Sequence, residues 1–157
     1  MQSMDEIYNQ FAKTVYKFLL ARTCNEDLAE ELTQETFFQA IRSIEKYDYS
    51  CSISTWLCAI AKTKYLEYLR KHPHYEDLYE SDAVLPEIPS AETVCIQSME
   101  QMELMKKLHS LPEPFKEIMY LRLFGNLSFA EIGKIMDRNE NWARVNFYRA
   151  KERLKGV

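Results

Sequence analysis

Residues 111–155 limit the fold of this chain more than any other stretch, because they alternate helical periodicity with short turn signals. Pro112 and Pro114 mark a turn that a helix can follow but hardly contain. Apolar side chains then recur at helical spacing until Gly125 and Asn126, a pair typical of a helix C-terminus. This segment is therefore predicted to form short, closely spaced helices.

A second, short helix is predicted directly after that stop. Ser128 and Glu131 fit the S-x-x-E pattern of a capping box. The apolar residues predicted to face inward are Ile132, Ile135 and Met136. Residues 137–139 make a tight connection, and Asn139 is a suitable N-cap for a final helix that runs to about Lys155. Two short helices joined by such a turn, the second of them basic, indicate a helix-turn-helix.

The final helix is predicted to have one packed face and one outward face, at about 100° per residue. The packed face holds Ala143, Phe147, Ala150 and Leu154. The outward face suits a DNA major groove, where Arg pairs with guanine, Asn pairs with adenine and Val contacts the thymine methyl group. The candidate DNA-reading residues are Asn139, Asn141, Trp142, Arg144, Val145, Tyr148 and Arg149. The alternative is a solvated basic helix that closes an ordinary bundle, and an outward Val and Tyr beside Arg and Asn favours DNA reading over it.

The composition favours an all-α protein. The chain has 157 residues, enough for one ordinary domain or two small ones, and only 3 Gly and 5 Pro. We expect two small helical domains joined by a flexible acidic linker, with domain 1–72, linker 73–91 and domain 92–157.

The linker is predicted from a loss of helical periodicity, and it contains Pro73, Pro86 and Pro89. His72 and His74 are interpreted as linker residues rather than metal ligands.

The formal net charge of −4 conceals two basic islands. Residues 51–71 hold 4 basic and 1 acidic side chain, and residues 138–157 hold 6 and 2. The spacer 72–104 has 8 acidic side chains and no Lys or Arg. Because phosphate binding depends on local charge, the acidic total does not exclude a nucleic-acid partner.

No targeting or metal-binding signal is found. The N-terminus lacks the pattern of a signal peptide, and no apolar run approaches the ~20 residues of a membrane span, so we expect a cytoplasmic protein without membrane insertion. The four cysteines, Cys24, Cys51, Cys58 and Cys95, form no C-x-x-C pair and are expected to be reduced and mostly packed. The sequence holds no nucleophile–base pair or phosphate loop, so we predict no catalytic residue, no metal and no cofactor.

Three helices are predicted in the first half of the chain. The first spans 5–22 after the cap Ser3, and the second follows the cap Asn25 toward Tyr47, with apolar positions through Leu28, Leu32, Phe37 and Ile41. The second helix carries an acidic side formed by Glu30, Glu31, Gln34 and Glu35. From the residues alone, this side is interpreted as a solvated face.

The third helix, beginning near Ser52 or Ser54, interleaves aromatic and basic residues. These residues are Trp56, Lys62, Lys64, Tyr65, Tyr68, Arg70 and Lys71. Rings that stack on bases, beside cations that follow phosphates, are typical of single-stranded nucleic-acid binding. The alternative is that Trp56 and Tyr68 belong to the core, and for Trp56 this alternative is favoured.

Motifs in three places together resemble the bacterial extracytoplasmic-function (ECF) sigma factors. Residues 28–37 resemble the polymerase-docking helix of that family. Its promoter-melting helix is similar to Ser54-Thr55-Trp56-Leu57, Ile60-Ala61-Lys62 and Glu67-Tyr68-Leu69-Arg70. Its C-terminal helix-turn-helix is similar to Leu111-Pro112-Glu113, residues 127–132 and residues 149–154. The resemblance covers nearly the whole chain, with the motifs in the family's order.

The resemblance implies an alternative sigma factor that binds core RNA polymerase and promoter DNA. The acidic helix with Glu30, Glu31, Gln34 and Glu35 would dock on the polymerase, contrary to its interpretation as a merely solvated face. The 139–149 helix would read the −35 element. The −10 element would be melted and held by Tyr47, Tyr49, Ser52, Lys62, Thr63, Lys64, Tyr65 and Arg70. An anti-sigma factor is the implied regulatory partner.

Two departures from the family pattern affect specificity. Thr63 stands where many members have Asn facing the melted strand, so the resemblance leaves the −10 preference open. Asn141-Trp142-Ala143-Arg144 replaces the commoner opening of the recognition helix, so the −35 sequence is not implied either.

Two other functions compete with the sigma-factor prediction. A stand-alone helix-turn-helix regulator, with a helical dimerisation or sensing domain, would be favoured by a palindromic pair of half-sites. A small helical enzyme or metal-dependent hydrolase that uses the acidic helix lacks a paired His–carboxylate set. The sigma factor is the favoured prediction.

Overall fold

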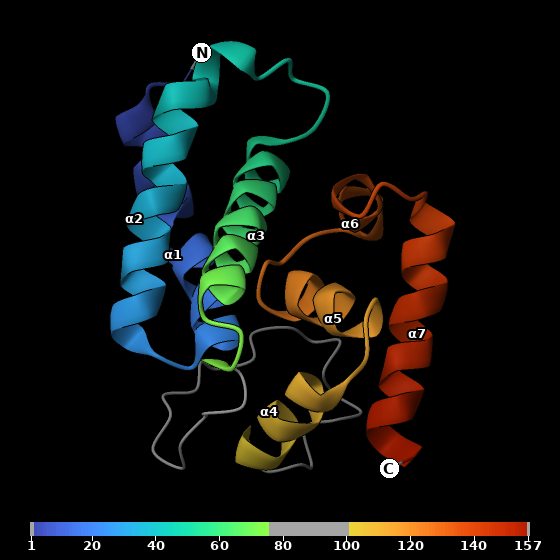
Figure 1. Cartoon of the computed structure of the whole chain (residues 1–157). Helices are drawn as coiled ribbons and strands as arrows, with labels where there is room; N and C mark the ends of the chain where they lie inside the picture. The colour runs from blue at the N-terminus through green and yellow to red at the C-terminus, as the bar shows by residue number, and fades with distance from the viewer. Residues whose placement is uncertain (1, 76–100, 157) are drawn as a thin grey trace. The chain divides into compact units, whose positions relative to one another are not determined.

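The computed structural model describes residues 2–75 and 101–156, and every regular element within them is a helix (Figure 1). The predicted all-α class is confirmed. The chain divides into two compact units, Met1–Val84 and Leu85–Val157. The predicted linker 73–91 and the helix expected to resume near Ser90 fall largely outside the described residues, so the exact domain bounds stay a prediction.

The N-terminal unit consists of three helices that pack against one another. They are α1 (Met4–Thr23), α2 (Glu26–Ser43) and α3 (Ile53–Lys71), with a 3-10 turn η1 (Ile44–Lys46) after α2 (Figure 1). Each helix starts at a polar cap: the side-chain oxygens of Ser3, Asn25 and Ser52 accept backbone N–H bonds at 3.2, 2.9 and 3.2 Å. The core between the helices is built from Ile7, Val15, Phe18, Leu19, Leu32, Phe37, Leu57 and Ala61. The two predicted caps, Ser3 and Asn25, are confirmed.

Two tyrosine hydroxyls join α3 and the turn after it to the end of α1. Tyr65 donates to the Arg22 carbonyl at 3.2 Å, and Tyr75 donates to the Thr23 carbonyl at 2.6 Å. Burial raises the pKa of Tyr75 to about 12, because a phenolate would lose its hydration there. Tyr75 therefore contacts the N-terminal unit, although it follows the predicted domain end at residue 72.

The C-terminal unit contains α4 (Gln101–Ser110), α5 (Phe115–Leu123), α6 (Phe129–Ile135) and α7 (Glu140–Gly156). Helix α5 packs against the other three, and α6 packs against α7 (Figure 1). The predicted capping box is confirmed: Glu131 N–H donates to Ser128 Oγ at 3.1 Å, and Ser128 N–H donates to Glu131 Oε1 at 3.0 Å. Of the residues predicted to face inward on α6, Ile132 is buried, whereas Ile135 and Met136 are half-buried.

Helix α5 ends where the sequence predicts, but Gly125 and Asn126 have different roles from those expected of a helix C-terminus. Asn126 takes the left-handed conformation, with φ at 56°, whereas Gly125 does not have a positive φ. Gly125 is required by proximity instead, because a Cβ there would lie 2.7 Å from the Leu121 carbonyl oxygen. The chain can therefore pass close to the end of α5 before the short helix begins.

A second close approach shapes the turn between α6 and α7. The Gly133 carbonyl accepts the Arg138 N–H at 2.7 Å, and a Cβ on Gly133 would lie 2.7 Å from the Arg138 carbonyl oxygen. The carbonyl oxygen of Asn139 would be only 2.9 Å away. Asp137 turns the chain with φ at 59°. The turn can double back onto α6 only because residue 133 has no side chain.

We expect Gly133→Ala to lower the free energy of unfolding of the C-terminal unit by roughly 1–3 kcal/mol, since the added methyl group meets backbone that cannot rotate away. Chemical denaturation of the full chain, followed by circular dichroism, measures this loss. The matched control is Lys134→Ala, an exposed change on the same helix that should stay within about 0.5 kcal/mol of the wild type. Equal stability of the two variants would contradict the packing argument.

Candidate nucleic-acid interface

Helix α7 has the two faces that the sequence predicts. The buried face holds Ala143, Phe147, Ala150 and Leu154. The opposite face exposes Asn141, Arg144, Val145, Tyr148 and Arg149. Val145 is 36% exposed and Tyr148 is 52% exposed, which leaves two large, partly apolar side chains in solvent beside guanidinium groups. A helix with this outward chemistry, after a short capped helix, has the layout of a DNA recognition helix.

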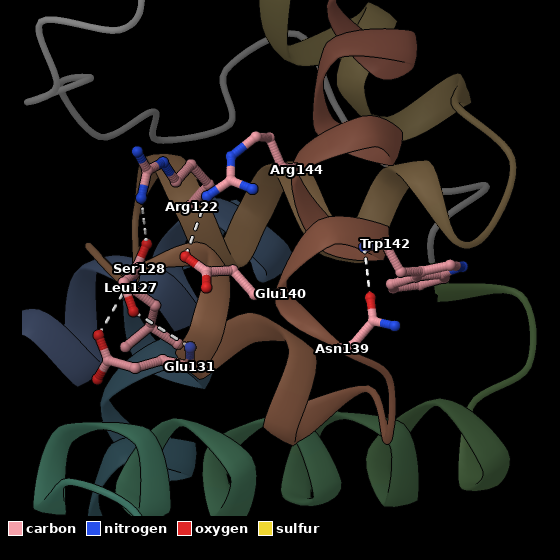
Figure 2. A network of polar contacts seen from close by, with 8 residues as sticks. All are labelled: Arg122, Leu127, Ser128, Glu131, Asn139, Glu140, Trp142 and Arg144. Atoms are coloured by element: carbon pink, nitrogen blue, oxygen red, sulfur yellow. Dashed lines mark hydrogen bonds and ion pairs between the residues drawn. The ribbon is translucent and has the colours of Figure 1, made fainter.

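The other two predicted DNA-reading residues help to build the start of this helix. Asn139 Oδ1 accepts the Trp142 N–H at 2.7 Å, which confirms Asn139 as the N-cap (Figure 2). Trp142 is half-buried, with the Arg138 guanidinium carbon 5.2 Å from the centre of its indole ring. The buried Asn146 amide donates to the Trp142 carbonyl at 2.9 Å. Asn139 and the Trp142 backbone thus hold the first turn of α7.

A cationic cluster lies around the Phe129 ring, at the starts of α6 and α7. Arg144 pairs with Glu140 at 3.0 Å (Figure 2). The Arg144 guanidinium carbon lies 5.5 Å from the Phe129 ring centre. Arg122 lies closer, at 4.0 Å from the same ring, and donates to the Leu127 carbonyl at 2.8 Å. Sequence reasoning did not select Arg122. The available signal was a basic residue in the last turn of the helix that precedes the capping box.

The candidate single-strand surface lies on α3. Thr63 and Arg70 are exposed, and Lys62 and Lys64 are half-buried. The Thr63 hydroxyl donates to the Ala59 carbonyl at 3.0 Å, and Lys64 lies 3.7 Å from Glu67. A surface cleft of about 370 Å³ opens beside Thr63 and Lys64, and its lining also includes Gln39, Trp56, Ala59, Ile60 and Glu67. Trp56 is half-buried, so it packs on one side and lines the cleft on the other.

One of the eight predicted −10 residues is wrong. Tyr65 is only 1% exposed, its hydroxyl is bonded within the core, and the Arg22 guanidinium carbon lies 4.8 Å from its ring centre. Its aromatic ring therefore cannot stack on an unpaired base. The sequence pattern misassigned it because the preceding Lys62 and Lys64 resemble a nucleic-acid surface. The turn of the helix instead directs residue 65 toward the end of α1.

The buried side chain of Tyr47 holds the loop 47–52 in place. Tyr47 is 9% exposed, stacks on Trp56 with ring centres 4.9 Å apart, and donates its hydroxyl to the Cys51 carbonyl. Burial is the main cause that raises the pKa of Tyr47. Tyr49 lies outside this stack, 61% exposed, with φ at 63° and its ring centre 4.6 Å from that of Tyr47. Tyr47 thus positions the loop, and Tyr49 is the aromatic ring that the loop presents to solvent.

The acidic side of α2 is exposed at all of Glu30, Glu31, Gln34 and Glu35. It is continued by two apolar side chains, Phe38 and Ile41, which are 62% and 54% exposed. Ile41 extends the apolar pattern in sequence, but it is not covered by α1 or α3 in the described unit. A surface that combines carboxylates with exposed apolar groups is better suited to a protein partner than a uniformly charged one.

The cysteines and acidic residues give no metal site in the described part of the chain. Cys24 and Cys58 are buried and Cys51 is half-buried, all three as free thiols, whereas Cys95 lies outside the described residues. Within residues 2–75 and 101–156, no group of three or more His, Cys, Asp or Glu side chains could hold a metal ion. None of the described helices is both long and apolar enough to cross a membrane.

Comparison with known proteins gives matches over both units. Residues 7–74 match the family model described as Sigma-70 region 2, and residues 101–154 match Sigma-70, region 4. The ECF RNA polymerase sigma factor SigM of Bacillus subtilis is 32% identical over 156 residues, covering 99% of this chain and 94% of SigM. SigE of Mycolicibacterium smegmatis is 31% identical over 158 residues, covering 99% of this chain and 61% of SigE.

Solved structures share the fold at lower identity. The sigma factor RpoE of Bartonella quintana, crystallised with the anti-sigma factor NepR, superposes with a TM-score of 0.71 at 19% identity. The match covers 97% of this chain and 94% of RpoE.

The corrected role of Tyr65 can be tested by Tyr65→Phe. Removing the hydroxyl leaves the Arg22 carbonyl without that donor, so the free energy of unfolding should fall by about 1 kcal/mol. Strand opening at a promoter, followed by permanganate reactivity of unpaired thymines, should stay unchanged under conditions where the variant is folded. A folded Tyr65→Phe or Tyr65→Leu variant with a selective opening defect would restore Tyr65 to the strand-holding surface.

Proposed function

This chain belongs to the ECF RNA polymerase sigma factors, and we propose that its two units divide promoter recognition between a duplex-reading helix and a strand-holding surface. As a member of that family, it is an alternative sigma factor that binds core RNA polymerase and directs transcription from specific promoters. The observation that carries the division of labour is the exposed stripe of α7 opposite its buried stripe.

Helix α7 reads the −35 element as duplex DNA. Its outward Arg144, Asn141 and Val145 offer a guanine donor, an adenine partner and a methyl contact within two helical turns. Glu140 holds the Arg144 guanidinium from one side, which restricts its rotamers before DNA arrives. Arg122 extends the cationic surface toward the start of α6, where a first helix of this motif crosses the phosphate backbone.

The α3 face and the loop 47–52 hold the unpaired −10 strand. Tyr49 offers an exposed ring for stacking, and Lys62, Lys64 and Arg70 supply cations for phosphates. Ser52 and Thr63 lie along the same edge, and their hydroxyls already bond within α3. Because the Thr63 hydroxyl is engaged by its own helix, its contribution to base reading differs from that of an Asn side chain.

The mixed surface of α2 docks on core RNA polymerase. Glu30, Glu31, Gln34 and Glu35 supply the polar contacts, and Phe38 and Ile41 supply apolar area that stays in water in the free protein. Once polymerase holds both units at promoter spacing, two weak DNA contacts reinforce each other through effective concentration. This role calls for positioning and trapping of bases rather than covalent chemistry, and it places the protein in the cytoplasm with the polymerase.

A protein inhibitor is the proposed regulatory partner. The relative RpoE has been crystallised in complex with the anti-sigma factor NepR. The exposed apolar side chains on α2 and α7 give this chain surfaces that such an inhibitor could cover.

Reversing charge at Glu31 and Glu35 should abolish binding to core polymerase and leave the helix content unchanged, because both side chains are exposed. Co-purification with core polymerase and circular dichroism measure the two effects. The control reverses Glu103 and Glu152, which are also exposed and make the same change in net charge in the other unit. Retained co-purification of the Glu31/Glu35 variant would contradict docking through α2.

Arg144→Ala should weaken closed-complex formation about tenfold or more, because a bidentate contact to a base is worth roughly 1–3 kcal/mol. The loss should shrink on templates that lack a −35 element. Lys62→Ala should instead leave closed complexes mostly intact and slow strand opening, because Lys62 contacts the melted strand.

Permanganate footprinting on matched and pre-melted promoters separates these two defects. A template already melted at −10 should rescue Lys62→Ala and should not rescue Arg144→Ala. The same defect for both variants on both templates would show that the two units do not divide the work.

A further inference from the structure

One aromatic ring lies between arginines of two different helices in the C-terminal unit. Phe129 is the first residue of α6, Arg122 lies in the last turn of α5, and Arg144 lies in the second turn of α7. The Arg122 guanidinium carbon lies 4.0 Å from the Phe129 ring centre, and that of Arg144 lies 5.5 Å from it. Both distances are within the range of a cation–π interaction. The same ring therefore attracts both cations.

The Phe129 ring is itself held in place. Phe129 is half-buried, and its ring centre lies 5.4 Å from that of Phe147, which belongs to the buried stripe of α7. The backbone beside it is fixed by the capping box of Ser128 and Glu131. The ring can therefore act as a support for Arg144, which is exposed.

The two arginines need such a support because they carry like charges. Glu140 pairs with Arg144 at 3.0 Å, and Arg122 donates to the Leu127 carbonyl at 2.8 Å (Figure 2). Each of these contacts holds one arginine, whereas the Phe129 ring attracts both. Without the ring, repulsion between the guanidinium groups would favour rotamers that move them apart. The ring therefore limits how far the two cations separate.

We propose that Phe129 is a positioning residue for promoter recognition, and that its ring holds Arg122 and Arg144 as a pair of fixed spacing. The inference rests on the proposed function, in which Arg144 reads a base of the −35 element and Arg122 extends the cationic surface toward the phosphate backbone. Phosphate contacts set the register of a protein on DNA, and base contacts read the sequence. A ring that fixes the spacing of these two cations couples the register to the reading of the base.

The test changes the charge distribution of the ring and keeps its apolar shape. Phenylalanines that carry increasing numbers of fluorine atoms are placed at residue 129 of the full-length chain. Fluorine withdraws electron density from the ring face, which weakens its attraction for a cation. On a promoter that depends on its −35 element, closed-complex formation with core polymerase should weaken stepwise along the series, by about fivefold or more in total.

Two ordinary substitutions and one control accompany the series. Phe129→Tyr keeps the ring face and should stay within about twofold of the wild type, whereas Phe129→Leu keeps an apolar side chain without a ring and should behave like the most fluorinated chain. The matched control is the same fluorination at Phe115, where the nearby guanidinium is that of Arg153, 4.7 Å from the ring centre. Closed-complex formation should stay within about twofold of the wild type in this control.

The arginine background separates positioning from packing. Fluorination at residue 129 should have a smaller effect in the Arg144→Ala chain and none in the Arg122→Ala, Arg144→Ala double variant, because no cation is left for the ring to hold. A loss of equal size in that double variant would assign Phe129 to packing alone and overturn the proposal. Thermal unfolding, followed by circular dichroism, scores packing in each chain independently of DNA.

The remaining outcomes distinguish this inference from the proposed function. If Arg144→Ala weakens closed complexes but fluorination of the wild-type chain does not, the positioning role of Phe129 is overturned and −35 reading by α7 stands. If Arg144→Ala forms closed complexes as well as the wild type, −35 reading by Arg144 is overturned, and the positioning role that rests on it falls as well.

Discussion

The burial of one narrow stripe of α7 is the interaction on which the DNA-reading surface depends. Ala143, Phe147, Ala150 and Leu154 pack inward, and the two alanines allow a close helix–helix approach. Successive side chains of an α-helix are fixed about 100° apart around its axis. Burying this stripe therefore sets the direction of every other side chain on α7. Arg144 and Tyr148 face solvent as a consequence of that packing, before any DNA is bound.

Close backbone contacts set the entry into that helix. Gly133 lets the turn approach α6, and Asn139 then caps α7 through the Trp142 N–H. The Glu140–Arg144 pair and the Phe129 ring restrain the first outward arginine. The Glu140–Arg144 contact is modest in energy, since exposed ion pairs contribute little to stability. The effect of these contacts is to reduce the rotamer freedom that DNA binding would otherwise have to remove.

The N-terminal unit has a different requirement. Aromatic rings that stack on unpaired bases must be exposed to solvent and must also be held rigidly by the residues beneath them. The buried Tyr47 stacks on Trp56 and bonds the loop backbone, so the loop can present Tyr49 with a positive φ. A positive φ at a non-glycine residue is unfavourable unless the surroundings hold it. The buried Tyr47 therefore supports the exposed Tyr49. Two tyrosines only two positions apart thus have different roles, one in packing and one at the surface.

The sequence by itself determined the all-α class, the helix starts at Ser3, Asn25, Ser128 and Asn139, and the two faces of α7. These features follow from local chemistry, because caps act within one turn and helical periodicity assigns residues to faces. The motifs also led to the family, since their order along the chain does not depend on tertiary contacts. Local chemistry does not determine which neighbouring element covers a given face.

Only the tertiary structure decided which of these faces are covered. Tyr65 and Tyr49 were both predicted to contact the −10 strand. The Tyr65 hydroxyl instead bonds to the end of α1, whereas Tyr49 is exposed to solvent. Phe38 and Ile41 continue an apolar pattern and still lie exposed, because α1 and α3 already cover the other side of α2. The need for glycine at residue 133 likewise depends on segments brought together by folding. Periodicity specifies which residues share a face, whereas burial depends on the element that packs against it.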